Sequence, residues 1–177
     1  NGHAIRHPSG TTRREPPFLL RNQGGKFKDI TARGGSYFRA DHLARGAALG
    51  DLDNDGKVDL VVSHMNEPVA VLRNVAAGGN HWLGVQLVGR GNADVVGARV
   101  VLEAGGRTQT RFARSGGSYA SSPDRRLVFG VGKADRVERL AVSWPDGTRH
   151  EWTGLALDRY HVLVQGEPEP RASRPRK

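Results

Sequence analysis

Four aspartates fall within nine consecutive residues, between two apolar stretches of the chain. They are Asp51, Asp53, Asp55 and Asp59, in the segment GDLDNDGKVDLVV that runs from Gly50 to Val62. Carboxylates this close repel one another, so they destabilise the fold unless a cation neutralises them. Calcium takes about six to eight oxygen ligands at flexible geometry, which carboxylates at alternate positions supply. The residue types and their spacing therefore predict a binding site for Ca2+.

Each position of this acidic loop (residues 51–59) has a role in the prediction. The expected metal ligands are the carboxylates at loop positions one, three, five and nine and the main-chain carbonyl at position seven, namely Asp51, Asp53, Asp55, Asp59 and Lys57. Gly56 permits the sharp turn after the third carboxylate, because glycine adopts backbone angles that other residues avoid. Val58 is expected to face inward and anchor the loop to the core.

Three other interpretations explain the acidic loop less well. An EF-hand needs a bidentate acid at position twelve and a helix on each side, whereas position twelve is Val62 and both flanks look like strands. Magnesium usually keeps several waters, whereas this loop offers many protein oxygens. A simple turn of aspartate, asparagine and glycine that binds no ion does not explain the regular spacing of the four acids.

Strands are expected on both sides of the acidic loop, because they must hold it in place. Apolar stretches at 47–49, 60–63 and 69–73 predict three strands, and a hairpin is expected over 18–31 around Gly24-Gly25. The string LLRNQGG echoes VLRNVAAGG further on, at a period of about fifty residues, which is in the range of propeller blades. This part of the chain therefore predicts one or more partial blades.

Beyond Gly78-Gly79 the sequence changes to short strands with alternating polarity. Leu83, Val85 and Leu87 share one face of the segment HWLGVQLVG, and further alternating segments follow up to YHVLVQG with turn residues between them. The expected fold class is all-β, with partial β-propeller blade(s) followed by a small antiparallel β-sandwich-like domain. The expected boundaries are a linker or loop at 1–17, the blade region with the calcium loop at 18–78, the β domain at 79–166 and a disordered tail at 167–177.

These segments resemble two known protein families. RGAALGDLDNDGKVDLVVSHMNEPVAVLRN resembles the FG-GAP/VCBS repeat, a calcium-binding propeller blade like those of integrin α-subunits. The later strings NHWLGVQLVG, GARV, SGGSYASSPDRRLVFGVG and VSWPDG look like the ASPIC/UnbV domain, which commonly follows such repeats. The two resemblances cover about residues 18–165. The departures are mild: Pro123 precedes Asp124, and Val131 stands where the family often has leucine.

The resemblance carries expectations about function and location. It implies extracellular, periplasmic or cell-surface proteins of the cartilage-acidic-protein-like type, with calcium in the blade loop and no established enzymatic activity. Partners are then expected to be proteins or glycans at the cell surface. The chain has no initiator methionine and no apolar run at its N-terminus, so it is expected to be a fragment or a processed chain whose signal peptide lies outside it.

A second candidate binding segment is SGGSYASSPDRR, residues 115–126. Tyr119 offers an aromatic face for stacking, while Asp124 and Arg126 offer partners for hydroxyl or carboxylate groups. This segment and the basic surface give the alternative function, a glycan- or polyanion-binding module. The simpler interpretation is a structural loop in which Asp124 binds backbone amides or pairs with an arginine.

Composition and missing motifs exclude several other functions. The 177 residues carry a formal net charge of +9 and no cysteine, which rules out disulfides and thiolate zinc sites. No nucleic-acid-binding motif accompanies the charge, so a solvated basic surface is the better explanation and nucleic acid is not an expected partner. No apolar run is long enough for a membrane span.

Chemistry by an enzyme or by a zinc ion is not expected either. The sequence has no paired acid and base in a recognisable context, and a hydrolase using Asp124 or the acidic loop is the alternative weighed against this view. Among the seven histidines only His3 and His7 have paired spacing, in a segment without a helical pattern.

Overall fold

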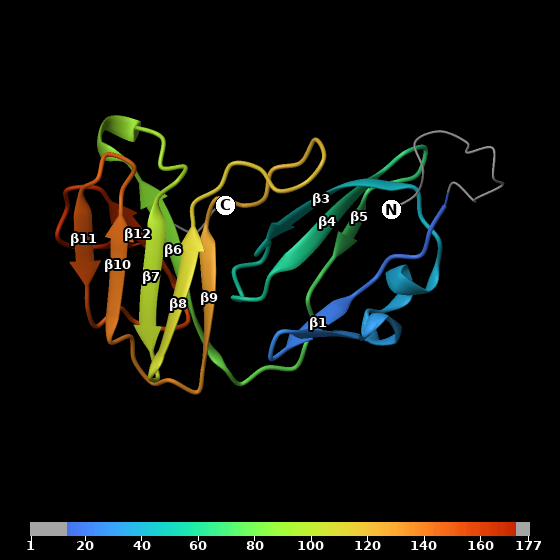
Figure 1. Ribbon diagram of the computed structural model, residues 1–177, viewed down its shortest axis with the longest axis horizontal. Coiled ribbons are helices and arrows are strands. Elements are labelled where there is room, and N and C mark those ends of the chain that lie inside the picture. Colours follow the sequence, from blue (N-terminus) through green and yellow to red (C-terminus); the bar gives the residue numbers. More distant parts are fainter. Residues whose placement is uncertain (1–13, 173–177) are drawn as a thin grey trace.

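The computed structural model describes residues 14–172, which fold into strands and three short 3-10 helices grouped around four sheets (Figure 1). The first part of the chain contains β1 (Leu20–Gln23), β2 (Lys26–Asp29), η1 (Thr31–Arg33), η2 (Ser36–Arg39), β3 (Ala44–Gly50), β4 (Asp59–His64) and β5 (Ala70–Leu72). The second part contains β6 (His81–Val88), η3 (Arg90–Asn92), β7 (Arg99–Ala104), β8 (Arg107–Phe112), β9 (Leu127–Gly132), β10 (Arg139–Ser143), β11 (Arg149–Trp152), β12 (Tyr160–Val164) and β13 (Arg171–Ala172). Within residues 14–172, no helix has the length and apolar character needed to cross a membrane.

The N-terminal unit (residues 14–78) consists of a hairpin and a three-stranded sheet. Strands β1 and β2 pair around Gly24-Gly25, where the amide of Gly25 donates to the Asn22 side chain, so the predicted hairpin is confirmed. Strands β3, β4 and β5 form an antiparallel meander, close to the three strands expected from the sequence. The acidic loop is the β3–β4 connection of this sheet.

The C-terminal domain (residues 79–172) has two four-stranded sheets that pack against one core (Figure 1). Their strand orders are β11-β10-β7-β8 and β13-β12-β6-β9. The expected all-β class is confirmed, but the expectation of a wholly antiparallel domain is wrong, because β12 runs parallel to β6. Alternating polarity looks the same in a strand with a parallel neighbour and in one with an antiparallel neighbour. The sequence therefore did not reveal the parallel pairing of β12 with β6.

The core lies between these two sheets. Its fully buried side chains come from both layers: Leu83, Val85, Phe129 and Leu163 from one sheet, and Val100, Leu102, Leu140 and Val142 from the other. The predicted shared face of Leu83, Val85 and Leu87 on β6 is therefore confirmed as the inward face. Trp144 and Trp152 also join the core, whereas Trp82 is only half-buried and packs toward the N-terminal unit instead.

Both ends of the described chain hold contacts that the sequence did not predict. Glu15, expected in a linker, forms a bridge with His42. Residues 171–172, expected in a disordered tail, form β13 and pair with β12. The remaining residues of the expected linker and tail, 1–13 and 173–177, lie outside the described residues.

Candidate metal centre between the two domains

The acidic loop is held in shape by its own aspartates. The Asp51 carboxylate accepts the main-chain N–H groups of Asp55 at 3.1 Å and Gly56 at 2.9 Å. The Asp59 carboxylate accepts the N–H groups of Leu52 at 2.9 Å and Asn74 at 2.8 Å. The first and last acids thus close the loop on itself and join it to the segment after β5.

Three of the predicted ligands converge on one point. Asp51, Asp53 and Asp59 each offer a carboxylate oxygen, and these oxygens lie within 4.8 Å of one another. Asp51 and Asp59 are only 2% exposed, whereas Asp53 is exposed and forms an ion pair with Arg73. Burying carboxylates is unfavourable unless hydrogen bonds, an ion pair or a bound cation stabilises their charge.

The other two residues of the predicted shell, Asp55 and Lys57, contact each other. Asp55 lies outside the converging group, and its carboxylate instead contacts the Lys57 ammonium at 2.8 Å. Hydrogen bonds from the side chain and main chain of Lys57 hold the pKa of Asp55 below its usual value. The two side chains therefore form a local pair within the loop.

The C-terminal domain supplies the inner wall of the site. The Tyr160 hydroxyl donates to Asp51 at 2.6 Å, and burial together with this hydrogen bond raises the pKa of Tyr160, so it stays a neutral donor. The Trp82 ring packs edge-on against Tyr160, with centroids 5.1 Å apart. Trp82 also covers Gly56 so closely that the loop must have a residue without a side chain there.

Arg126 connects the acidic loop to the segment 115–126. Its guanidinium contacts the Asp124 carboxylate at 2.6 Å and donates to the Asn54 side chain at 2.5 Å and to the Asp51 carbonyl at 2.7 Å. It also lies over the Tyr160 ring, 4.3 Å from the centroid. Burial opposes its charge, but the hydrogen bond to Asp124 and the nearby acids outweigh this, so the pKa of Arg126 lies above its usual value.

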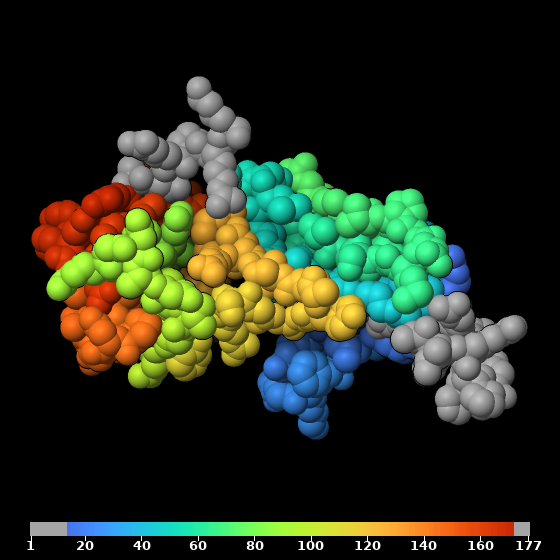
Figure 2. Space-filling view, turned by 90° about the horizontal axis from the view of Figure 1, so that it is seen from above, coloured from blue at the N-terminus to red at the C-terminus, as the bar shows by residue number. Residues whose placement is uncertain are grey.

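The segment 115–126 crosses the boundary between the two domains, as the yellow and light-orange atoms beside β3 show in Figure 2. The Ala47 amide donates to Ser118 at 3.1 Å, and the Asp124 amide donates to the Leu49 carbonyl at 2.8 Å. Asp124 and Arg126 therefore lie together at the acidic loop, while Tyr119 stays 74% exposed.

The structure adds residues to the site that the sequence did not single out for it. Tyr160 and Trp82 were expected only as strand residues, and Tyr160 is 109 residues away from Asp51 in the chain. Asn74 had one weak signal, its match to Asn22 in the repeated LRN string. No local sequence pattern links Tyr160 and Trp82 to the loop, because their contacts with it depend on how the two domains pack.

The carboxylates in this arrangement fit a hard divalent cation. All three converging groups are oxygen donors, which such ions prefer over nitrogen or sulfur. Within residues 14–172, Asp51 and Asp59 accept hydrogen bonds from neutral groups and form no ion pair of their own. Their negative charge therefore has no direct cationic partner among those residues.

Fold and site define an all-β protein in which a small acidic-loop unit packs against a two-layer β domain. Residues 88–170, which make up most of the two-layer part, match the family described as ASPIC and UnbV. The chain is similar to cartilage acidic protein 1 of Xenopus tropicalis, with 34% identity over 113 residues, 60% of this chain and 17% of that protein. The human protein of the same name is 35% identical over 108 residues, which are 58% of this chain and 16% of that protein. The chain therefore spans about one sixth of the length of these relatives.

Proposed function

We propose that this chain is a non-catalytic, calcium-binding module with a binding or scaffold role. Asp51, Asp53 and Asp59 would hold the ion, and the Lys57 carbonyl and the Asp55 carboxylate, once released from the Lys57 ammonium, would complete the shell. The observation that carries this proposal is the convergence of Asp51 and Asp59, each 2% exposed, without an ion pair in the described chain. Calcium would supply the missing positive charge.

The site's position suggests what calcium would do for the fold. Asp51 contacts Tyr160 directly and Arg126 through its carbonyl, so an ion on this loop would also fix the junction between the domains. The sheet β3-β4-β5 would then be part of a propeller blade of the FG-GAP/VCBS type, which holds the ASPIC/UnbV domain in one orientation. A rigid junction favours binding of a partner, because the two domains then lose less orientational freedom, and so less entropy, when the complex forms.

An extracellular or cell-surface location is part of this proposal. The relatives are named for cartilage, an extracellular tissue, and extracellular calcium suits modules that bind it at about 0.1–1 mM. A surface protein or glycan is then the expected partner. Turnover of glycan or ester substrates by the purified chain would contradict the non-catalytic role.

Calcium is expected to raise the melting temperature of the chain, and a chelator should reverse the rise. At about 100 times the dissociation constant, the ion adds roughly 2.7 kcal/mol, or about 5–10 °C for a chain of this size. Asp53→Asn should remove most of this shift, because Asp53 is an exposed member of the converging group and its loss should spare the fold. The exposed Asp135→Asn is the matched control and should respond like wild type.

Two results of the calcium experiment would contradict the proposal. One is an identical melting curve with calcium and with chelator. The other is an equal calcium response in wild type and Asp53→Asn, which would place the ion elsewhere in the chain.

A cleft next to segment 115–126 favours the second candidate function, binding of a sulfated glycan. The cleft encloses about 440 Å³ between β3, β8 and this segment. Its lining includes Arg111, Arg114 and Arg125, together with Phe112, which is 46% exposed. Several arginines beside an exposed ring suit sulfate groups on a sugar chain, because the arginine guanidinium can donate two parallel hydrogen bonds to the oxygens of an oxyanion.

Heparin binding tests this second candidate. The double variant Arg111→Gln/Arg114→Gln should weaken binding and lower the slope of log affinity against log salt by about 2, or about 1 for each lost arginine contact. The exposed Arg21→Gln, on the β1–β2 hairpin, is the matched control and should leave the slope unchanged. Loss of binding on removing residues 173–177 alone would assign the interaction to the tail and contradict the cleft.

A further inference from the structure

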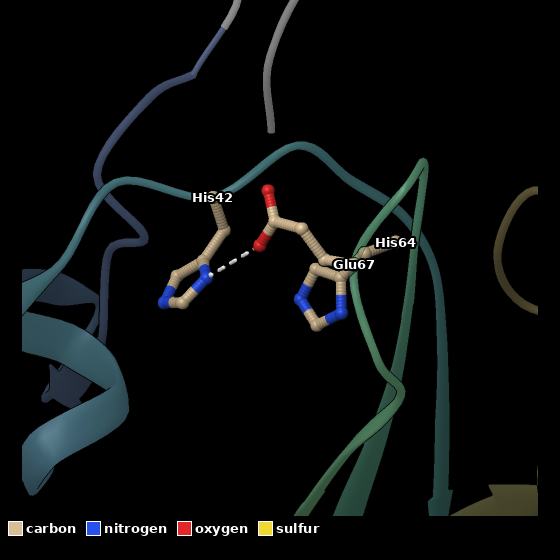
Figure 3. A group of neighbouring side chains, drawn as sticks. All are labelled: His42, His64 and Glu67. Carbon is tan, nitrogen blue, oxygen red and sulfur yellow. Dashed lines mark hydrogen bonds and ion pairs between the residues drawn. The ribbon is translucent and has the colours of Figure 1, made fainter.

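A second group of metal-ligating side chains lies at the other end of β4 from the acidic loop. His64 ends this strand, Glu67 lies in the turn that follows it, and His42 precedes β3 (Figure 3). One ligand atom from each residue lies within 4.8 Å of the other two. The side chains of His42 and Glu67 are 17% and 15% exposed, and His64 is also partly buried.

Backbone carbonyls fix which nitrogen of each histidine carries hydrogen. Nε2 of His42 lies 3.0 Å from the Tyr37 carbonyl, and Nδ1 of His64 lies 2.7 Å from the Pro68 carbonyl. A carbonyl only accepts, so each of these nitrogens must be an N–H donor. In the neutral rings, Nδ1 of His42 and Nε2 of His64 are then the nitrogens with lone pairs. This is the arrangement that metal-binding histidines show, with the second nitrogen bonded to a carbonyl.

The contact between His42 and Glu67 is favourable only with a proton or a metal ion between the two side chains. Nδ1 of His42 faces Oε2 of Glu67 at 3.3 Å, so a lone pair meets a carboxylate unless a proton or a metal lies between them. The other carboxylate oxygen, Oε1, accepts the Leu43 N–H at 3.3 Å and contacts Arg14 at 2.9 Å. These two donors hold the carboxylate in place and leave Oε2 directed at the imidazole.

Tyr37 positions both rings of the group. It stacks on His42, with ring centroids 4.1 Å apart, and its hydroxyl donates at 2.9 Å to the lone pair of Nε2 of His64, a hydrogen bond that a metal ion would replace. Figure 3 shows the two imidazoles side by side near the Glu67 carboxylate, and the rings are tilted by 39° with centroids 5.3 Å apart. The lone-pair nitrogens and the carboxylate are therefore held in place by neighbouring groups.

We propose that His42, His64 and Glu67 form a zinc site, distinct from the acidic loop. Two imidazole nitrogens and one carboxylate oxygen suit zinc, which binds nitrogen ligands and takes a fourth ligand such as water. Calcium would not compete well, because it prefers a shell made of oxygen atoms. The ion would tie the segment before β3 to the β4–β5 turn. Sequence spacing missed this site, since the two histidines are 22 residues apart and lie in different segments.

Zinc titration of the full chain tests the proposal. Calorimetry with zinc chloride should give one site per chain, and His64→Gln or Glu67→Gln should each weaken it by at least tenfold. His161→Gln, on β12, and the double variant His3→Gln/His7→Gln are the histidine controls and should bind zinc like wild type. Asp53→Asn should also bind zinc normally, which separates this site from the proposed calcium site.

X-ray absorption of the zinc-loaded wild-type chain gives a test that needs no variant. The spectrum should show a shell of nitrogen and oxygen atoms with two imidazoles. A spectrum with no more than one imidazole would overturn the proposal, and so would the absence of zinc binding by wild type. Equal zinc affinity in wild type, His64→Gln and Glu67→Gln would overturn it too.

Discussion

Arg126→Ala is expected to lower the free energy of unfolding by about 3 kcal/mol and to loosen the junction between the two domains. The variant removes the contacts to Asp124, Asn54 and the Asp51 carbonyl, along with the cation–π contact to Tyr160. Asp124 would then keep a half-buried negative charge without its partner, which is the main source of the loss. Chemical denaturation measures this loss directly.

The neighbouring arginine provides the control for this experiment. Arg125 is 63% exposed at its side chain and its nearest contact to Asp94 is 3.8 Å, so Arg125→Ala should change stability by less than about 0.5 kcal/mol. Arg126→Lys should fall between the two, because lysine keeps the charge but cannot make the forked contacts. Equal stability of Arg126→Ala and Arg125→Ala would show that the junction does not depend on this side chain.

Gly56→Ala is expected to be about as damaging, for a steric reason. Gly56 has φ +82°, and a Cβ there would lie 2.2 Å from the nearest ring atom of Trp82. The positive φ costs alanine about 1–2 kcal/mol, and the overlap adds about 1–3 kcal/mol because the loop must move off the ring. The loop would then no longer present Asp51 to Tyr160, so the calcium-dependent rise in melting temperature should also disappear.

A second glycine separates the two causes in this prediction. Gly25 has φ +87°, but a Cβ at this position would have no heavy atom within 4 Å. Gly25→Ala therefore reports only the loss of stability caused by the positive φ. The excess loss in Gly56→Ala then measures the contact with Trp82. Combining Gly56→Ala with Trp82→Ala should recover part of that excess, and losses of the same size in Gly25→Ala and Gly56→Ala would contradict the steric explanation.

These two variants address the same feature, the junction at the acidic loop. The loop belongs to β3 and β4, but Trp82, Tyr160 and Arg126 of the C-terminal domain surround it. A ligand on the loop is therefore expected to change the stability of both domains together. Hydrogen exchange with and without calcium would reveal this as slower exchange in β3 and in β12 at once.

Local patterns were enough to predict most strands and one face of the core. Leu83, Val85 and Leu87 alternate with polar or small residues, and all three are buried as expected. Paired glycines marked the β1–β2 turn, because a tight hairpin needs positive φ there. The spacing of the four aspartates likewise predicted that their carboxylates would meet, and three of them do, since a short loop between two paired strands keeps them together, whereas Asp55 pairs with Lys57 instead.

The sequence by itself determined what local chemistry specifies: the all-β class, the strand faces, and an acidic loop in which three of the four carboxylates converge. Only the tertiary structure decided the partners of that loop, the parallel pairing of β12 with β6, and the meeting of His42, His64 and Glu67. The physical reason is distance along the chain. Alternation and turn residues constrain near neighbours, whereas contacts such as Tyr160 to Asp51 arise only when packed layers bring remote segments together.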